Sequence, residues 1–358
     1  MNVLLNPALT MRYSIFSVQD HYPGQGREVA EFYQQVGAEA KLAEALGYDG
    51  FFVAEHHFHE YGVSPDPAVL LAALAAITTR IKLGSAIAVL PFHHPLALAE
   101  RYAMVDVLSG GRLVLGVGSG YLAHEFAGFA IDPAEKRARF DENLAIVKRA
   151  LMGERITFTG QFNCIDGVAI NVLPIQKPLP PIYVAALRAE SAYHIGKQGY
   201  PILAVPYAAV AGFSDIGVLV SDYQRGFHES GMAGRGDAII MLHTHVAPTD
   251  AEARRRAAAA FDRYVASRLY ARRQTYDDIL ASGLGLFGSV ATVIDKMLGL
   301  YEVGVRHVMM LHNFGLLAPE LVEHSMRLVA EEVMPRVEAE INARYLPQGI
   351  ANTIASTA

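Results

Sequence analysis

The chain has 358 residues, of which 52% are hydrophobic, 18% charged and 9% aromatic, a composition typical of a globular protein and not of a disordered or fibrous one. Thirty Lys and Arg residues against 36 Asp and Glu residues give a net charge of −6, which offers nucleic acid or an anionic membrane no electrostatic attraction. The single cysteine, Cys164, excludes an intrachain disulfide and a CxxC motif.

We expect a soluble protein of the cytoplasm. The first ten residues lack the basic region of a signal peptide. The longest apolar run, residues 68–77, is about half as long as a bilayer crossing requires. A lone cysteine also suits a reducing compartment.

Strand-like apolar runs alternate with helix-like segments throughout the chain. The expected strands are residues 12–18, 50–54, 81–90, 112–118, 181–187, 201–206, 238–246 and 305–311. The expected helices are residues 29–46, 67–77, 95–108, 134–151, 189–198, 215–230, 250–273 and 290–303. Gly47, Gly199 and Gly304 stand between such a helix and the next strand, where a left-handed residue commonly ends a helix.

Eight βα units in this order predict an α/β fold, the (β/α)8 TIM barrel. Two segments exceed the minimal barrel. Residues 155–172 predict a hairpin inserted before the fifth strand, and residues 254–288 predict an insertion of helix and glycine-rich loop before the last unit. No low-complexity linker divides the chain, so we expect residues 1–358 to form a single domain.

Ionisable residues crowd the end of the second strand, and enzymes with this barrel place their sites at such strand ends. The order there is Glu55, His56, His57, Phe58 and His59. Because histidine titrates near neutrality and Glu55 could orient or bias an imidazole, His56 is a candidate general acid or base. The alternative, that the histidines only hydrogen-bond the loop, applies equally well to His57 and His59.

A zinc site is a rival interpretation of the same histidines, and His243 and His245 would project from one face of a strand. Metal-dependent hydrolases on this barrel, however, resemble a family with a His-x-His pair on the first strand. The first strand here has no such pair. We therefore expect no metal.

The fourth strand runs into Gly116, Gly118, Ser119, Gly120 and Tyr121. Glycines at alternate positions would let the backbone approach a flat or phosphorylated ligand, although they could instead only relieve crowding at the barrel rim. The dinucleotide motif GxGxxG is excluded, because Tyr121 takes the place of its third glycine and no clear helix begins there.

A phosphate site is expected where the fifth strand passes into a helix. Leu187, Arg188 and Ser191 lie at this junction, where helix amides, a guanidinium and a hydroxyl could bind a phosphate. The pair Gly288 and Ser289 is an alternative phosphate site, which an ordinary helix N-cap explains equally well.

Three segments resemble the bacterial luciferase-like flavin monooxygenases: LGYDGFFVAEHHF (46–58), IKLGSAIAVLP (81–91) and SGGRLVLGVGSGY (109–121). The match runs in order over most of the chain. The resemblance implies a barrel that binds reduced FMN, usually delivered by a separate flavin reductase, and that uses dioxygen to oxygenate a small organic substrate. The family tendency also favours a homodimer.

The resemblance assigns roles position by position. His56 matches the catalytic histidine beside the flavin, and Glu55 matches the carboxylate that precedes it. Ala86 and Ile87 match a pair whose non-proline cis peptide supports the flavin ring. The remaining matches are the segment along the ribityl chain and phosphate, Ser119, Gly120 and Tyr121, and the phosphate-binding turn, Leu187, Arg188 and Ser191.

Two departures and two alternatives qualify the resemblance. The luciferase itself has cysteine and arginine at the positions of Gly118 and Ser119, so light emission is not implied, and Arg188 could compensate for the missing cation. Relatives that transfer hydride with a deazaflavin coenzyme offer a second function. A noncatalytic flavin-binding subunit is a third, against which the retained Glu55 and His56 argue. Nothing in the sequence names the substrate.

Overall fold

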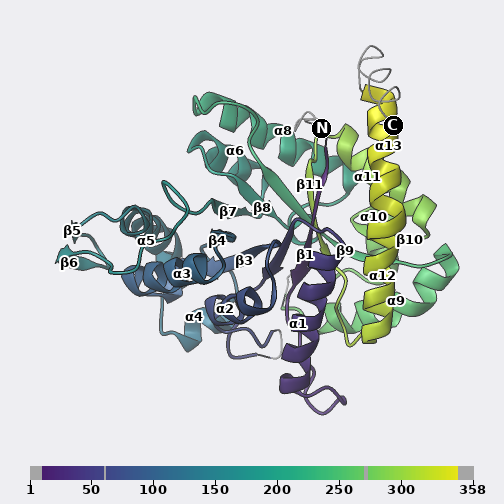
Figure 1. The fold of residues 1–358 in the computed structure, drawn as a ribbon, viewed down its shortest axis with the longest axis horizontal. Helices are drawn as coiled ribbons and strands as arrows, with labels where there is room; N and C mark the ends of the chain where they lie inside the picture. Colours follow the sequence, from purple (N-terminus) through teal and green to yellow (C-terminus); the bar gives the residue numbers. More distant parts are fainter. Residues whose placement is uncertain (1–9, 60–61, 270–272, 346–358) are drawn as a thin grey trace.

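Eight parallel strands form a closed barrel at the centre of the computed structural model, which describes residues 10–59, 62–269 and 273–345, and helices surround them (Figure 1). In order around the barrel, the strands are β1 (Arg12–Ser17), β2 (Gly50–Val53), β3 (Lys82–Val89), β4 (Leu113–Gly118), β7 (Ile182–Ala186), β8 (Ile202–Ala204), β9 (Ala238–Val246) and β11 (His307–Leu311). Pairing of β9 with both β8 and β11 closes the ring. The predicted TIM barrel is confirmed.

A helix is present at each of the eight predicted positions, and the described residues form five further α-helices. Together, these helices are α1 (Val29–Ala45), α2 (Pro67–Ile77), α3 (Pro95–Leu108), α4 (Ala123–Gly128), α5 (Lys136–Leu151), α6 (Ala189–Lys197), α7 (Pro206–Ala209), α8 (Phe213–Glu229), α9 (Asp250–Ser267), α10 (Tyr276–Ser282), α11 (Val290–Glu302), α12 (Pro319–Leu328) and α13 (Met334–Tyr345). Gly47, Gly199 and Gly304 have φ angles of 83°, 79° and 96°, which confirms the left-handed helix ends. No helix in the described ranges combines the length and the apolar character that a membrane crossing requires.

The hairpin insertion is confirmed as the antiparallel pair β5 (Ile156–Thr159) and β6 (Cys164–Val168). The second insertion differs from the prediction, because residues 285–288 form a strand, β10 (Gly285–Gly288), and not a loop. This strand pairs in parallel with residues 243–246 of β9. Its extended form therefore depends on a partner some 40 residues away along the chain, which local composition does not reveal.

Two helix predictions are wrong in detail. The helix expected over 250–273 ends at Ser267, where Arg268 turns to an extended backbone and packs its buried guanidinium 3.9 Å from the ring centre of Tyr264. Residues 270–272 of that prediction lie outside the described ranges. A short helix, α4, does begin two residues after Tyr121, and burial of Phe126 and Glu125 holds it in place.

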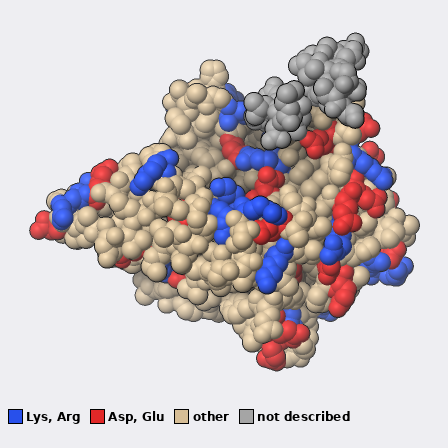
Figure 2. All heavy atoms as spheres, in the orientation of Figure 1, with Lys and Arg blue, Asp and Glu red and all other residues tan. Residues whose placement is uncertain are grey.

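Charged side chains of both signs intermingle on the face that Figure 2 shows. Where this face is described, it therefore carries no extended basic surface of the kind that binds a polyanion. This agrees with the negative net charge of the sequence.

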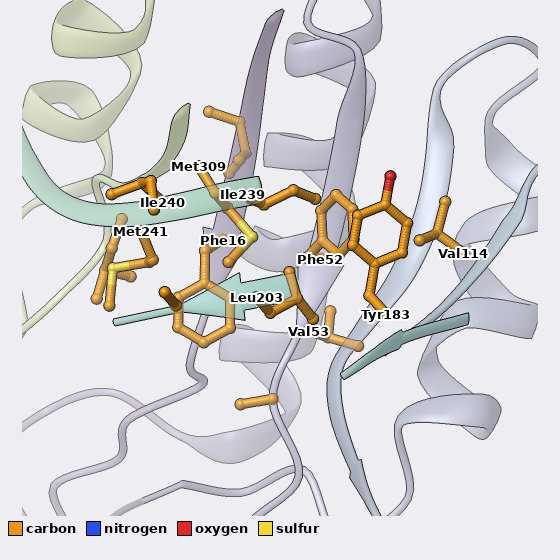
Figure 3. Packing of buried hydrophobic residues seen from close by; sticks show 14 of the residues in the cluster. Phe16, Phe52, Val53, Val114, Tyr183, Leu203, Ile239, Ile240, Met241 and Met309 are labelled. Atoms are coloured by element: carbon orange, nitrogen blue, oxygen red, sulfur yellow. The ribbon is translucent and has the colours of Figure 1, made fainter. Parts of the chain in front are cut away.

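Side chains fill the barrel interior from its N-terminal end. Phe52, Tyr183 and Ile239 pack together there (Figure 3), and a Cβ on Gly84 would overlap the Phe52 ring. Met241 lies two residues beyond Ile239 on the same face of β9 and so one layer nearer the C-terminal ends of the strands. The interior is therefore solid up to this layer.

A buried polar cluster joins the loops that follow β1 and β11. The Asn313 side chain donates to Glu39 Oε1 at 2.6 Å, and the Gly315 amide donates to Asp20 Oδ2 at 2.7 Å. Arg27 donates to the Asp20 carbonyl at 2.6 Å. Burial raises the pKa of Glu39 to about 7. The cluster completes the rim of the barrel at the junction of its first and last strands.

Candidate active site

A cavity of about 510 Å³ opens at the C-terminal ends of the barrel strands, within the size range of sites for small molecules and cofactors. All ten residues that the sequence predicts for the site line it: Glu55, His56, Ala86, Ile87, Ser119, Gly120, Tyr121, Leu187, Arg188 and Ser191. These residues lie within or shortly after four different strands, so the fold brings together what the sequence separates. Their individual roles stay predictions.

The His56 imidazole lies on the cavity wall with 12% of its side chain exposed. Its Nδ1 is 3.2 Å from Glu125 Oε1, and the same oxygen accepts the His57 amide at 3.0 Å. Since a carboxylate only accepts, Nδ1 is assigned the hydrogen and the lone pair lies on Nε2. Burial lowers the pKa of His56 and outweighs the opposing effect of Glu125, so the imidazole is neutral at pH 7.

Glu125 has a predictable electrostatic effect on this histidine. In the Glu125→Gln variant we expect the pKa of His56 to fall further, because a neutral amide no longer stabilises the imidazolium form. An NMR titration of the His56 ring protons in the parent and in the variant would measure it. An unchanged or higher pKa would show that Glu125 does not govern His56.

Glu55 binds two imidazoles, but neither is that of His56. Its Oε1 accepts from His57 Nε2 at 3.0 Å and from His93 Nε2 at 2.9 Å, and its Oε2 accepts the Val89 amide at 3.0 Å. Burial would raise the pKa of Glu55, yet these donors more than compensate and lower it, so the carboxylate is ionised. Glu55 thus fastens the end of β2 to the end of β3.

The peptide bond between Ala86 and Ile87 is cis, as the resemblance implies. It lies in β3, close to the Val89 amide that donates to Glu55.

The His57 ring is held by Glu55 and belongs to the protein behind the cavity wall, because His57 does not line the cavity itself. This agrees with the alternative that the sequence leaves open for His57.

The three alternate glycines have two different roles. A Cβ on Gly116 would lie 2.5 Å from Leu203 Cδ1, and a Cβ on Gly118 would overlap the Ile87 side chain. At these two positions the absence of a side chain makes room for protein atoms, which confirms the crowding interpretation there. Gly120 instead has a φ of 73° and lines the cavity itself.

Cations gather at one end of the cavity. Arg188 precedes α6, and Ser191 Oγ accepts the Arg188 amide at 3.1 Å and donates to the Arg188 carbonyl at 2.7 Å. Lys136 and Arg137, at the start of α5, also line the cavity. The first N–H groups of α6 lack partners within the helix and favour an anion. This end therefore fits a phosphate dianion.

The alternative phosphate site is already filled by a carboxylate. Asp250 Oδ1 accepts the Ser289 amide at 2.6 Å and the Thr292 hydroxyl at 2.8 Å, at the start of α11. Ser289 Oγ accepts the Thr292 amide at 3.3 Å, as an N-cap does. Because Asp250 would repel an anion here, the pair Gly288 and Ser289 caps a helix.

The histidines that suggest a zinc site do not form one cluster. His56 and His57 bind different carboxylates, and His243 is enclosed by aromatic rings, with the Tyr207 ring centre at 5.1 Å. Burial lowers the pKa of His243 to about 3, so it is a neutral core residue. Within the described ranges, no three His, Cys, Asp or Glu side chains are grouped to hold a metal ion.

Residues 11–307 match the family of luciferase-like monooxygenases. Limonene 1,2-monooxygenase of Rhodococcus erythropolis is 28% identical over 84% of this chain and 80% of that protein. The oxygenase component of the flavin-dependent trigonelline monooxygenase of Acinetobacter baylyi is 26% identical over 68% of this chain and 67% of that protein. An F420-dependent glucose-6-phosphate dehydrogenase of Microbacterium testaceum is 34% identical, over 44% of this chain and 49% of that protein.

Among solved structures, monooxygenase RslO1 from Streptomyces bottropensis superposes with a TM-score of 0.84. It is 29% identical in sequence, and the match covers 91% of this chain and 99% of that one. The family match spans the barrel from β1 to the start of β11, including all ten cavity residues named above. The chain therefore belongs to the luciferase-like monooxygenases and is an oxidoreductase of that family.

Proposed function

We propose that this protein is a monooxygenase that uses reduced FMN and dioxygen to oxygenate a small organic substrate. The observation that carries the proposal is the single cavity in which a cationic end and the neutral imidazole of His56 lie on the walls of one space. The names of the limonene and trigonelline relatives support the same chemistry.

The residues present fit FMN. Arg188, Lys136 and Arg137, with the start of α6, would hold the phosphate, and the segment 119–121 would lie along the ribityl chain. The backbone of Ala86 and Ile87 would support the flavin ring. When bound, reduced FMN supplies the electrons that activate dioxygen.

In the proposed reaction, the protein's own side chains transfer one proton and keep water away from the reacting groups. His56 keeps the hydrogen on Nδ1, directed at Glu125, so that Nε2 takes up or returns a proton during oxygenation. Apolar residues such as Val89 and Leu203 line the same cavity and limit the access of water to the reacting groups. Glu55 contributes indirectly, because its hydrogen bonds hold together the ends of β2 and β3 that form part of the cavity wall.

Titration of the pure protein with FMN under anaerobic reducing conditions tests the proposal. We expect binding of the reduced form at micromolar concentration or tighter, and oxygen consumption coupled to product formation once a flavin reductase and a substrate panel are supplied. Absence of binding at high FMN concentration would reject the proposal.

Hydride transfer with a deazaflavin is the second candidate, favoured by the F420-dependent relative that is 34% identical over part of the chain. Such an enzyme would bind F420 in the same cavity and would turn over without consuming oxygen. Anaerobic turnover with F420, and none with FMN, would establish this second function in place of the first.

The proposal extends to the assembly in which the enzyme works. A separate flavin reductase is included because the trigonelline relative is named an oxygenase component. A homodimer in the cytoplasm, with residues 1–358 folding as a single domain, completes the proposal. Sedimentation analysis of the purified chain would measure the oligomeric state.

The cationic end should distinguish FMN from riboflavin, which lacks the phosphate. In the Arg188→Ala variant we expect the affinity for FMN to fall about tenfold or more, because a charge-assisted hydrogen bond to the phosphate is lost. The affinity for riboflavin should not change. Arg336→Ala, an exposed arginine of α13, is the matched control. Equal losses for both ligands would place the phosphate elsewhere.

A further inference from the structure

The cavity has a second, uncharged side formed by five residues: Phe16, Leu203, Met241, Tyr264 and Met309. We call it the inner subsite. Its residues come from β1, β8, β9, α9 and β11. In the closed order of the barrel strands, β11 lies opposite β4 and β1 lies opposite β7. Met309 and Phe16 therefore lie across the barrel from the helix starts that carry Lys136 and Arg188, whereas Leu203 lies on β8, next to β7.

Close packing defines the floor of the inner subsite. Figure 3 shows Phe16, Leu203, Met241 and Met309 near one another in the barrel interior, and all four line the cavity. Met241 and Met309 are directly paired residues of β9 and β11, and each is only 2% exposed. Below them Ile239 already fills the barrel. The two thioethers therefore set the depth of the cavity.

No Asp, Glu, Lys or Arg belongs to the inner subsite as defined by its five residues. The only polar side-chain atom among them is the Tyr264 hydroxyl. The Tyr264 ring is held from behind, with the Arg268 guanidinium 3.9 Å from its centre and the His243 ring centre at 4.9 Å. Arg268 thus supports this wall and is not itself part of the lining.

Two acids, Glu55 and Glu125, also line the cavity and discourage an anionic ligand away from the cationic end. Glu55 is ionised and bound by His57, His93 and the Val89 amide, and Glu125 is bound by His56. Both carboxylates are buried, where repulsion of a second negative charge is weakly screened.

We propose that the inner subsite binds the substrate, that this substrate is an uncharged, apolar organic molecule, and that Met241 and Met309 determine the length it accepts. The inference rests on the proposed function, because it takes FMN to lie along the cationic end, residues 119–121 and the backbone of Ala86 and Ile87, and assigns the inner subsite to a second molecule. Unbranched methionine side chains adapt to apolar ligands of varied shape, so the subsite selects by size and polarity.

A homologous series of primary alcohols, from butanol to decanol, probes the inner subsite in the FMN-loaded protein by titration calorimetry. We expect the affinity to rise about fourfold per methylene group until the subsite is full, and then to level off. Carboxylates and amines of the same lengths should bind at least tenfold more weakly. An affinity that is independent of length, or equal binding of the carboxylates or amines, would overturn the inference.

The methionine variants test which residues limit the length of the alcohol that the inner subsite accepts. Met309→Ala and Met241→Ala should each move the levelling-off point to longer alcohols, because both enlarge the subsite. Met310→Ala is the matched control, since Met310 is the buried neighbour of Met309 on the same strand and does not line the cavity. An equal shift in the Met310→Ala variant would remove the methionines from the inference.

The FMN titration keeps the two failures apart. Tight FMN binding without length-dependent alcohol binding would overturn the inner subsite and leave the proposed function intact. The alcohol series is therefore also titrated into the protein without FMN, where length-dependent binding combined with no FMN binding would reject the proposed function and leave the apolar inner subsite in place. Both measurements use the full chain.

Discussion

Replacement of His56 by alanine is expected to slow substrate oxygenation about 10²- to 10⁴-fold, the range observed when a general acid or base is lost. The variant removes the only imidazole that both lines the cavity and is held by Glu125 in the described structure. The protein should still fold, since the side chain is at the cavity surface and not in the core. FMN should still bind, because the cationic end is unchanged.

Single-turnover rates with reduced FMN would measure the effect, and circular dichroism would verify the fold. His59→Ala is the control, because His59 is near in sequence but does not line the cavity. A rate within threefold of the parent would remove His56 from the chemistry. A parent protein that binds FMN yet never turns over would instead match the noncatalytic subunit.

Among the proposed variants, Glu55→Ala is expected to lower the free energy of unfolding the most. Glu55→Ala leaves His57, His93 and the Val89 amide without their shared acceptor, and loss of one partner from a buried charged cluster costs about 3–5 kcal/mol. Urea unfolding followed by circular dichroism would measure the change. The exposed pair partner Glu323 provides the control, because Glu323→Ala should cost less than about 1 kcal/mol.

The contribution of Glu55 depends on pH in a defined direction. Its pKa is lowered in the folded protein relative to the ordinary value of 4.5. The stabilisation is therefore complete above pH 4.5 and is lost as the pH falls through the lower folded value. The difference in unfolding free energy between the parent and Glu55→Gln should shrink on acidification. A difference that grows below pH 4.5 would contradict the assignment.

Local signals in the sequence were sufficient for most of the barrel. The helix at 67–77 is predicted to the residue, because Asp66 caps it through the Ala68 amide at 3.0 Å and Pro67 occupies its first position. Continuous apolar runs locate the buried strands. The strand β10 was missed, because its extended form comes from pairing with β9 and not from its own glycine-flanked residues.

The residues of the site also fall into two groups, those that the sequence predicts and those that it does not. Residues at strand ends could be found in the sequence, because the barrel brings all such ends to one face. Glu125, Lys136 and Arg137 could not be found, since none of them stands at a strand end or, unlike Ser191, at a position to which the resemblance assigns a role. Glu125 meets His56 across 69 positions of sequence, and no spacing rule connects the two. The five residues of the inner subsite show only as buried strand and helix positions until the strands are arranged in a ring.

The buried polar cluster that contains Glu39 and joins the loops after β1 and β11 makes folding of this barrel consume a proton. Glu39 has a pKa of about 7 when buried and 4.5 ordinarily, so the native chain holds a proton there that the denatured chain releases. Conformational stability from this residue accordingly declines as the pH rises from 4.5 to 7. The calorimetric heat of denaturation near pH 6 will therefore vary with the ionisation enthalpy of the buffer that receives the proton.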